Sequence, residues 1–331
     1  MKAVVCDKYG PPEVLRLTEV DKPIPKDDEV RIKVYATTVH VGDTKIRALK
    51  PGMGAMLDPF VKAFMRVSVG FTHPKPLGME LSGVVDEVGS DVTAFRKGDE
   101  VFCSTGMHLG AYAEYVCLPV DTPLVRKPAN MTHEEAATVA NGATTAWVIL
   151  RKAHIEPGQR VLVYGASGSV GTFAVQIAKN LGAEVTGVCS GRNLELVRAL
   201  GAAKVIDYTA ADFTANGEKY DLVFDAVGKL SKSHVKGSLT ETGRYLNVLT
   251  DAGASMKVDA EDLLFVKDQV EAGKLKTVID RTYSLDEIVE AHRYVDTGHK
   301  RGNVVITVAA PDPAISAGRS ASSGASLSPP A

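Results

Sequence analysis

A run of apolar residues that leads into three evenly spaced glycines constrains the fold of this chain more than any other feature. The segment 161–164 is followed by Gly165, Gly168 and Gly171 at the spacing G-x-x-G-x-x-G, and an apolar pattern of helical period begins directly afterwards. A glycine turn between a strand and a helix lets backbone amides approach a diphosphate, and the helix N-terminus favours its negative charge. The sequence therefore predicts a dinucleotide-binding site, because the flanking strand and helix supply the context that a lone glycine pattern lacks.

Strand and helix patterns alternate on both sides of this turn. Short apolar runs predict strands at residues 161–164, 184–189, 204–206, 221–224 and 244–248, with helical periodicity between most of them. Parallel strands need crossover connections of about this length. We therefore expect an α/β fold with a doubly wound parallel sheet of the Rossmann type and helices on both faces.

The segment after the second of these strands bears on the choice of cofactor. A carboxylate at this point would bind the adenosine ribose of NAD, but the chain has Ser190, Gly191 and Arg192 with no acid between them. A hydroxyl and a guanidinium favour a 2′-phosphate, and hence NADPH. In the alternative interpretation, Arg192 is a solvated surface residue and Glu195 turns inward.

Length and composition limit the function classes. The 331 residues, 45% of them apolar, suffice for two domains, and a formal net charge of −2 gives no basic field for nucleic acid. No apolar run reaches the length of a membrane span, and the N-terminal residues enter a strand pattern directly, so we expect a cytoplasmic protein without nucleic-acid or membrane partners. The four cysteines are scattered without a C-x-x-C pair, which indicates neither a disulfide framework nor a structural zinc site.

The two ends of the chain differ from its middle. A small β domain is predicted in the first part of the chain, where apolar and polar residues alternate at Val30, Ile32 and Val34. Residues 309–331 contain too few large apolar side chains to fold, which predicts a disordered tail. A predicted helix near residue 60 has one apolar face; it either covers core or forms a lid over an apolar, flat substrate pocket, with Met53, Met56, Phe60 and Phe64 as lining residues.

Four further motifs lie along the chain: Gly78-Met79-Glu80-Leu81-Ser82-Gly83, Lys97-Gly98-Asp99-Glu100-Val101, Gly110-x-Tyr112-Ala113-Glu114, and the stretch from Gly158 to Lys179. Together they resemble the medium-chain dehydrogenase/reductase superfamily, and within it the zinc-free quinone oxidoreductases. The resemblance implies a GroES-like catalytic domain formed by residues 1–125 and 274–308. It also implies a Rossmann NADP(H)-binding domain at residues 126–273, with the active cleft between the two.

The positions of the zinc ligands in this superfamily indicate a metal-free site. Zinc-binding members carry a cysteine where this chain has Thr37 and Thr38, and a histidine where it has Met79; the cysteine cluster of the structural zinc is missing as well. A catalytic zinc needs three protein ligands, so no metal is expected. The remaining chemistry is hydride transfer to a conjugated acceptor, a quinone or an α,β-unsaturated carbonyl compound.

His40 is the candidate catalytic residue. The segment Val39-His40-Val41-Gly42-Asp43 stands where the quinone reductases resemble V-N-P-x-D, so that His40 replaces an asparagine. We expect its ring to donate a hydrogen bond or a proton, aided by Asp43, with a pKa near neutral. The alternative is a packed histidine bonded to a backbone carbonyl.

The resemblance also implies cofactor contacts position by position. The diphosphate is assigned to Gly165 and to the run Ser167, Gly168, Ser169, Val170 and Gly171. The 2′-phosphate is assigned to Ser190, Arg192 and Tyr208, and the ribose to the loop that begins at Asp225. Thr145, Asn247 and Asn303 are placed around the nicotinamide.

The chain departs from the family pattern after Val248. Members of the family pass through a helix and a sixth strand, but here only residues 249–260 precede the next predicted helix, so the sheet edge looks truncated. A short edge would weaken cofactor closure and a homodimer. The predicted function is an NADPH-dependent, metal-free reductase of quinones or enones. The alternatives are an enoyl thioester reductase of the same superfamily and a catalytically weak NADPH-binding sensor or scaffold protein.

Overall fold

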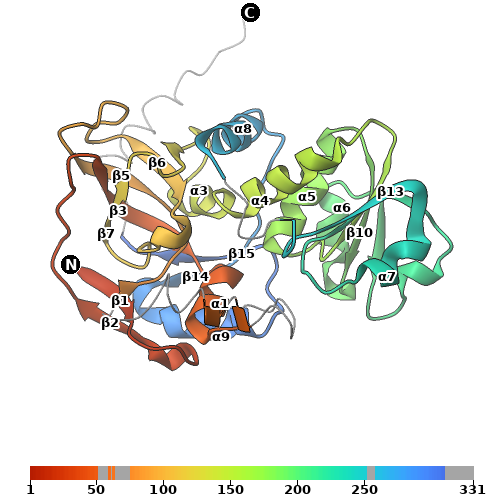
Figure 1. The fold of residues 1–331 in the computed structure, drawn as a ribbon, viewed down its shortest axis with the longest axis horizontal. Coiled ribbons are helices and arrows are strands. Elements are labelled where there is room, and N and C mark those ends of the chain that lie inside the picture. The colour runs from red at the N-terminus through yellow and green to blue at the C-terminus, as the bar shows by residue number, and fades with distance from the viewer. Residues whose placement is uncertain (51–58, 61, 64–74, 252–257, 310–331) are drawn as a thin grey trace, which may run out of the picture.

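The computed structural model of this chain describes residues 1–50, 59–60, 62–63, 75–251 and 258–309. Figure 1 shows two lobes, with the glycine-rich turn and its strands in one lobe and the first part of the chain in the other. The C-terminal strands return to the N-terminal lobe, and helices α4 and α8 lie between the two lobes. The predicted α/β fold with a parallel sheet is confirmed.

The N-terminal lobe is built on β-sheets. Its described strands form a seven-stranded sheet, in the order β14-β15-β3-β5-β6-β8 with β7 paired to β3, and a three-stranded sheet, β2-β1-β4. The strands are β1 (Lys2–Cys6), β2 (Leu15–Glu19), β3 (Glu29–Thr38), β4 (Lys75–Pro76), β5 (Glu80–Val88), β6 (Glu100–Ser104), β7 (Tyr115–Pro119), β8 (Leu124–Arg126), β14 (Ile279–Ser284) and β15 (Asn303–Thr307), and the helices are α1 (Val41–Ala48), α3 (His133–Val139) and α9 (Ile288–Asp296).

Strand β3 links this sheet to the predicted active site. Its alternating residues Val30, Ile32 and Val34 are fully buried, as their period predicts. At its far end β3 pairs antiparallel with β15, so that Val305 lies opposite Thr38. The C-terminal strand therefore lies beside the end of β3, immediately before His40.

The second lobe contains five parallel strands in the order β11-β10-β9-β12-β13. They are β9 (Arg160–Tyr164), β10 (Glu184–Cys189), β11 (Lys204–Asp207), β12 (Tyr220–Asp225) and β13 (Leu239–Asn247), and the accompanying helices are α4 (Gly142–Leu150), α5 (Ser169–Asn180), α6 (Leu194–Ala199), α7 (Lys232–Val235) and α8 (Ala260–Glu271). The chain runs from β9 to β10 on one side and to β12 on the other, so the order of the strands reverses at β9. Ligands of such sheets bind at this crevice, beyond the carboxyl ends of the strands.

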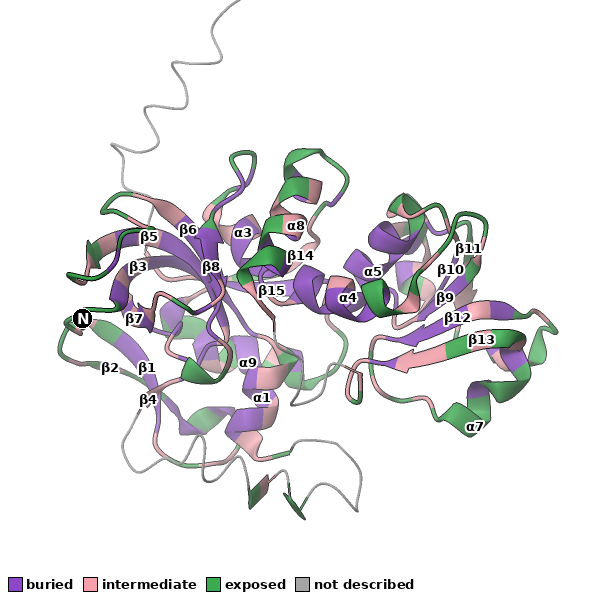
Figure 2. Ribbon diagram, turned by 45° about the horizontal axis from the view of Figure 1, so that its top comes forward, coloured by how far each residue is buried: buried purple, intermediate pink, exposed green. Residues whose placement is uncertain are grey.

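Helices α4 and α5 connect the cores of the two lobes. Figure 2 shows buried residues along both helices and along the strands on either side. The largest cluster of buried apolar residues joins Phe102 of the first sheet to Phe173 of α5 and Phe224 of β12. Side chains from both lobes therefore share one continuous core.

The edge of the parallel sheet bears on two predictions. Among the described residues the sheet ends at β13, without the sixth strand of the family pattern, and α8 follows shortly afterwards. Strand β13 begins at Leu239 rather than at residue 244 as predicted. The homodimer, which a short edge would weaken, stays a prediction.

Several sequence predictions concern residues at the margin of the described part. Met53, Met56 and Phe64 of the predicted lid, and residues 310–331 of the predicted tail, lie outside the described residues. Phe60 is described and is 74% exposed. Within the described part, no helix has the length and apolarity required to cross a bilayer.

Candidate active site

The glycine-rich turn has the geometry that a diphosphate site requires. Gly165 follows β9 with φ of +78°, a conformation that favours glycine. A Cβ on Gly171 would lie 2.1 Å from the Gly165 carbonyl oxygen, so only glycine fits where α5 crosses the turn. Gly168 precedes α5 and has no side chain to cap it. The first amides of this helix therefore remain free of a side-chain cap, and a bound anion would satisfy them.

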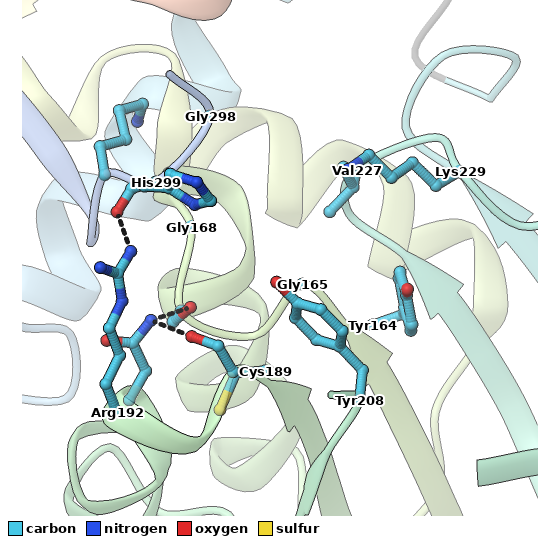
Figure 3. A pocket seen from close by; sticks show the side chains of 14 residues that line it. Tyr164, Gly165, Gly168, Cys189, Arg192, Tyr208, Val227, Lys229, Gly298 and His299 are labelled. Carbon is cyan, nitrogen blue, oxygen red and sulfur yellow. Dashed lines mark hydrogen bonds between the residues drawn. The ribbon is translucent and has the colours of Figure 1, made fainter. Parts of the chain in front are cut away.

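A pocket opens beside this turn, at the carboxyl ends of β9 and β10 (Figure 3). Six of the predicted cofactor residues line it together: Gly165, Ser167, Gly168, Ser190, Arg192 and Tyr208. They come from three separate segments of the chain, which the topology of the sheet brings to one edge. The pocket adjoins the turn on the side where the adenosine half of a dinucleotide binds in folds of this type.

Asn193 organises the polar wall of the pocket and was not predicted from the sequence. Its amide nitrogen Nδ2 donates to the hydroxyl oxygen of Ser167 at 3.0 Å and to that of Ser190 at 3.2 Å. Because both hydroxyl oxygens accept from Asn193, the hydrogen of each can be donated to an anion. The sequence signal that could have identified Asn193 is its position, three residues after Ser190, which was assigned to the 2′-phosphate.

The charge of the pocket is positive. Arg192, Lys229, His299 and Lys300 line it, and none of the described lining residues carries a carboxylate. Arg192 donates from Nη2 to the His299 carbonyl oxygen at 2.7 Å, as Figure 3 shows, and its side chain is otherwise exposed. The alternative interpretation of Arg192 as a solvated surface residue does not account for its hydrogen bond to the His299 carbonyl oxygen.

The first turn of α5 is joined to the other lobe. Ser169 donates its hydroxyl to the Asn303 side-chain oxygen at 2.6 Å, which brings two predicted cofactor residues into direct contact. Val170 is buried in the core cluster. Thr145 is also buried and lies on α4, whose Gly142 packs so closely on Ser169 that a Cβ would approach its hydroxyl to 2.6 Å. Thr145 is not among the residues that line the pocket, so its place beside the nicotinamide stays a prediction.

The side chains of Asp225 and Asn247 make local hydrogen bonds and do not line this pocket, so their places beside the ribose and the nicotinamide stay predictions. Asp225 is fully buried, and its carboxylate accepts hydrogen bonds from the amides of Val227, Gly228 and Leu230. Asn247 donates to the hydroxyl of Tyr245 and accepts from the amide of residue 249. The two residues shape the loop after β12, and it is Val227 of this loop that reaches the pocket.

His40 caps helix α1 at the end of β3. Its Nδ1 accepts a hydrogen bond from the Gly42 amide at 2.9 Å, so in the neutral ring the hydrogen is assigned to Nε2. His40 keeps part of its surface exposed, yet burial, followed by the nearby charge of Lys300, lowers its pKa from 6.5 to about 4. The expected pKa near neutral is therefore wrong, and the ring is a neutral hydrogen-bond donor at physiological pH.

Asp43 supports His40 through the backbone rather than through the ring. Its carboxylate accepts from the His40 amide at 3.0 Å and from the Gly78 amide at 3.2 Å, and the residue is fully buried. Burial raises its pKa to about 7. Asp43 therefore supports His40 by fixing the turn that carries it, and its part in catalysis stays a prediction.

A chain of buried polar groups continues from Asp43 into the lobe. The Tyr112 hydroxyl hydrogen bonds to the Asp43 carboxylate, and His292 Nε2 lies 3.2 Å from the same hydroxyl. On its other side, His292 Nδ1 lies 3.0 Å from the Arg47 guanidinium, which can only donate. His292 Nε2 must therefore carry the hydrogen and donate to Tyr112, so each hydrogen bond fixes the direction of the next.

Glu80 is a third buried acid beside this site. It accepts from the Thr38 hydroxyl and, at 2.8 Å, from the Asn141 amide, and burial raises its pKa to about 7. Its neighbour Met79 packs toward the helix cap, because a Cβ on Gly42 would lie 2.5 Å from the Met79 sulfur. In the described residues, no three His, Cys, Asp or Glu side chains are arranged to hold a metal ion.

Family models match three segments of the chain. Residues 26–129 match the alcohol dehydrogenase GroES-like domain, and residues 169–271 and 252–306 match two families described as zinc-binding dehydrogenase. The matched segments include strand β3, helix α5 and strand β14. Strand β9 and the part of the glycine-rich turn before residue 169 lie between two of the matched segments.

Individual relatives match along nearly the whole chain. The NAD(P)H oxidoreductase RTN4IP1, mitochondrial, of Bos taurus is 33% identical over 358 aligned positions, covering 93% of this chain and 89% of the relative. The 2-methylene-furan-3-one reductase of Solanum lycopersicum is 34% identical, covering 92% and 79%. The solved quinone oxidoreductase of Coxiella burnetii is 32% identical, with a TM-score of 0.82 and coverage of 93% and 99%. The bovine alignment is longer than this chain of 331 residues, so that relative carries segments absent here.

Proposed function

Because the chain belongs to the quinone oxidoreductase-like family of the medium-chain dehydrogenase/reductase superfamily, we propose that it is an NADPH-dependent reductase of quinones or α,β-unsaturated carbonyl compounds. We further propose that it works without a catalytic metal ion. Relatives named as a quinone oxidoreductase and as a reductase of a conjugated ketone support this substrate class.

The pocket beside the glycine-rich turn is the observation that carries this proposal. Its described lining contains cations and hydroxyls but no carboxylate, which favours a 2′-phosphate over the bare ribose of NADH. Asn193 holds the hydroxyls of Ser167 and Ser190 as donors, and Arg192 adds a guanidinium. These groups support NADPH as the preferred cofactor.

His40 supplies the chemistry on the acceptor side. When bound, the reduced nicotinamide supplies a hydride, which adds to the conjugated system and leaves negative charge on the carbonyl oxygen. The neutral His40 ring can donate its Nε2 hydrogen to that oxygen, and a proton from solvent then completes the reduction. A donor fixed by the Gly42 amide needs no reorientation during the reaction.

The side chains at the zinc-ligand positions of the superfamily support a metal-free mechanism. Thr38 donates its hydroxyl to Glu80, and Met79 offers a thioether rather than a nitrogen or thiolate ligand. Zinc in catalytic sites takes cysteine, histidine or carboxylate ligands, usually three of them. We therefore expect full activity after treatment with a chelator and no stoichiometric zinc by elemental analysis.

An acceptor panel tests the proposed reaction. Oxidation of NADPH and of NADH is followed with phenanthrenequinone, a 2-alkenal and crotonyl-CoA in parallel. We expect turnover of the quinone or the alkenal with NADPH. Turnover of crotonyl-CoA alone would instead indicate an enoyl thioester reductase, and tight NADPH binding without turnover of any acceptor would indicate a sensor or scaffold.

Arg192→Ala tests the cofactor preference. A charge-assisted hydrogen bond to a phosphate contributes a factor of about 10 to 150 in affinity, so the KM for NADPH is expected to rise by that factor. The KM for NADH should change less than about threefold. Arg198→Ala is the matched control, because Arg198 is a half-exposed arginine that pairs with Glu195 and does not line the pocket. Equal losses for both cofactors in Arg192→Ala would contradict the assignment.

The cytoplasmic location and the oligomeric state stay predictions. Sedimentation of the purified chain would decide between a monomer and a homodimer, and β13 is the edge on which that question bears.

A further inference from the structure

Lys300 is a half-buried cation that the proposed reaction does not use. It lines the cofactor pocket together with Ser167 and Gly168, and its Nζ donates to the Gly302 carbonyl oxygen at 2.6 Å. Among the described residues, no carboxylate lies within ion-pair distance of this Nζ. Burial lowers its pKa from 10.5 to about 8, although the more distant charges of Glu80 and Asp280 act in the opposite direction. An ammonium group withdrawn from water with a single carbonyl partner is costly, and such groups are found where an anion binds.

The other cations of the pocket are in a different situation. Arg192, Lys229 and His299 are exposed, whereas Lys300 is the least exposed of the four. Exposed cations lose little by remaining hydrated and gain little from an anion. Lys300 has already lost much of its hydration, so an anion placed beside it gains more.

The segment that carries Lys300 is held directly against the glycine-rich turn. The Gly302 amide donates to the Ser167 carbonyl oxygen at 2.8 Å, and Arg192 donates to the His299 carbonyl oxygen at 2.7 Å. Asn303 accepts from the Ser169 hydroxyl at 2.6 Å. These three contacts flank Lys300 on both sides, and Figure 3 shows its segment beside the turn. The position of the lysine is therefore fixed relative to the amides at the start of α5.

We propose that Lys300 is a ligand of the cofactor diphosphate, supplied by the catalytic lobe to a turn that has no cationic side chain of its own. This inference rests on the proposed function, because it requires a nicotinamide dinucleotide in the pocket. A helix N-terminus contributes only about half a positive charge. The diphosphate carries two negative charges, and the run from Gly165 to Gly171 contains no lysine or arginine. Lys300 completes the neutralisation and couples cofactor binding to the contact between the lobes.

Binding measurements on the full chain separate this role from recognition of the 2′-phosphate. The ligands are NADPH, which carries both groups, and adenosine 2′-monophosphate, which lacks the diphosphate. The variants are Lys300→Met, Lys300→Gln and Lys300→Arg, with Lys232→Met as the matched control, because Lys232 is an exposed lysine that does not line the pocket. Lys300→Gln keeps a donor for the Gly302 carbonyl while removing the charge, so it remains informative if Lys300→Met does not fold.

The expected pattern is specific to the diphosphate. Lys300→Met and Lys300→Gln should weaken NADPH binding by a factor of about 10 to 150, while adenosine 2′-monophosphate binding changes less than about threefold. Lys300→Arg should restore NADPH binding to within about fivefold of the natural chain, and Lys232→Met should leave it within about threefold.

Two results would overturn the inference. NADPH binding that is unchanged in folded Lys300→Gln would show that the ammonium group contacts no part of the cofactor. Equal losses for NADPH and adenosine 2′-monophosphate would move its contact to the 2′-phosphate. If the natural chain binds no NADPH at all, the proposed function itself fails, which is distinguishable from either result.

Discussion

Replacing His40 tests whether a neutral imidazole is the hydrogen-bond donor to the acceptor oxygen. With a pKa of about 4, only about one His40 ring in a thousand is protonated at pH 7. The neutral ring still carries its hydrogen on Nε2, because Nδ1 accepts from the Gly42 amide. Loss of one preorganised donor to a developing oxyanion costs about 10²–10³ in kcat. We expect a loss of this size in His40→Ala, measured as initial rates of NADPH oxidation with phenanthrenequinone.

A matched variant separates this donor from the helix cap. His40→Ala also loses the cap of α1, which costs about 0.5–2 kcal/mol of unfolding free energy and is measured by urea denaturation. His40→Asn keeps a side chain that can both cap and donate, so its kcat is expected within about tenfold of the natural chain. A folded His40→Ala variant with unchanged kcat would refute the donor role.

The pH dependence provides a second criterion. His40, with a pKa of about 4, does not titrate near neutral pH. The rate profile of His40→Asn is therefore expected to follow that of the natural chain in this range. An ionisation near neutral pH that is present in the natural chain and absent from His40→Asn would mean that the imidazolium takes part, contrary to this reasoning.

Three further predictions concern stability and the turn. Burial raises the pKa of Glu80 from 4.5 to about 7. The unfolding free energy linked to its proton is therefore fully present below about pH 4.5 and is lost as the pH rises through about 7. In Glu80→Gln this loss of unfolding free energy should be smaller, as measured by denaturation from about pH 5 to 8. Tyr112→Phe removes a hydroxyl that joins two buried partners, His292 and Asp43. It should lower the unfolding free energy by about 1–3 kcal/mol in urea denaturation. No change is expected only if a water molecule takes the place of the hydroxyl. Gly171→Ala puts a methyl group 2.1 Å from the Gly165 carbonyl oxygen and should abolish NADPH binding, as measured by calorimetry. In the control Gly237→Ala the added methyl group has no other atom within 4 Å, so this variant should bind NADPH normally.

The sequence predicts the cofactor turn well because the turn is local. Gly168 and Gly171 have their nearest contacts with Gly165 inside the turn, and Gly165 has a positive φ. The strand and helix on either side are each formed by a continuous pattern. The same holds for the order of strands and helices, since parallel strands with crossovers leave few alternatives. Ser190 and Arg192 follow the second strand and reach the same pocket for the same topological reason.

Roles that depend on hydrogen-bond partners were harder to predict. Asp43 and Asp225 were expected to aid His40 and to lie beside the cofactor, and backbone amides occupy both carboxylates. Asp43 accepts from His40 and Gly78, and Asp225 accepts from the loop that follows it. A short acidic side chain competes readily for nearby amides, and the local backbone path decides this competition, which residue type alone does not specify. The pKa of His40 was misjudged for a related reason, since burial depends on the lobes packed around it.

The contacts of residues 298–303 explain why the remaining part of the site could not be read from the sequence. This segment leads into β15, the strand that pairs with β3 beside His40. Its carbonyl and amide groups bond to Ser167 and Arg192 of the other lobe, more than a hundred residues away in the chain. No periodicity or spacing encodes a contact at such separation. The consequence is mechanistic: the segment that leads into the strand beside His40 also holds the turn that binds the cofactor.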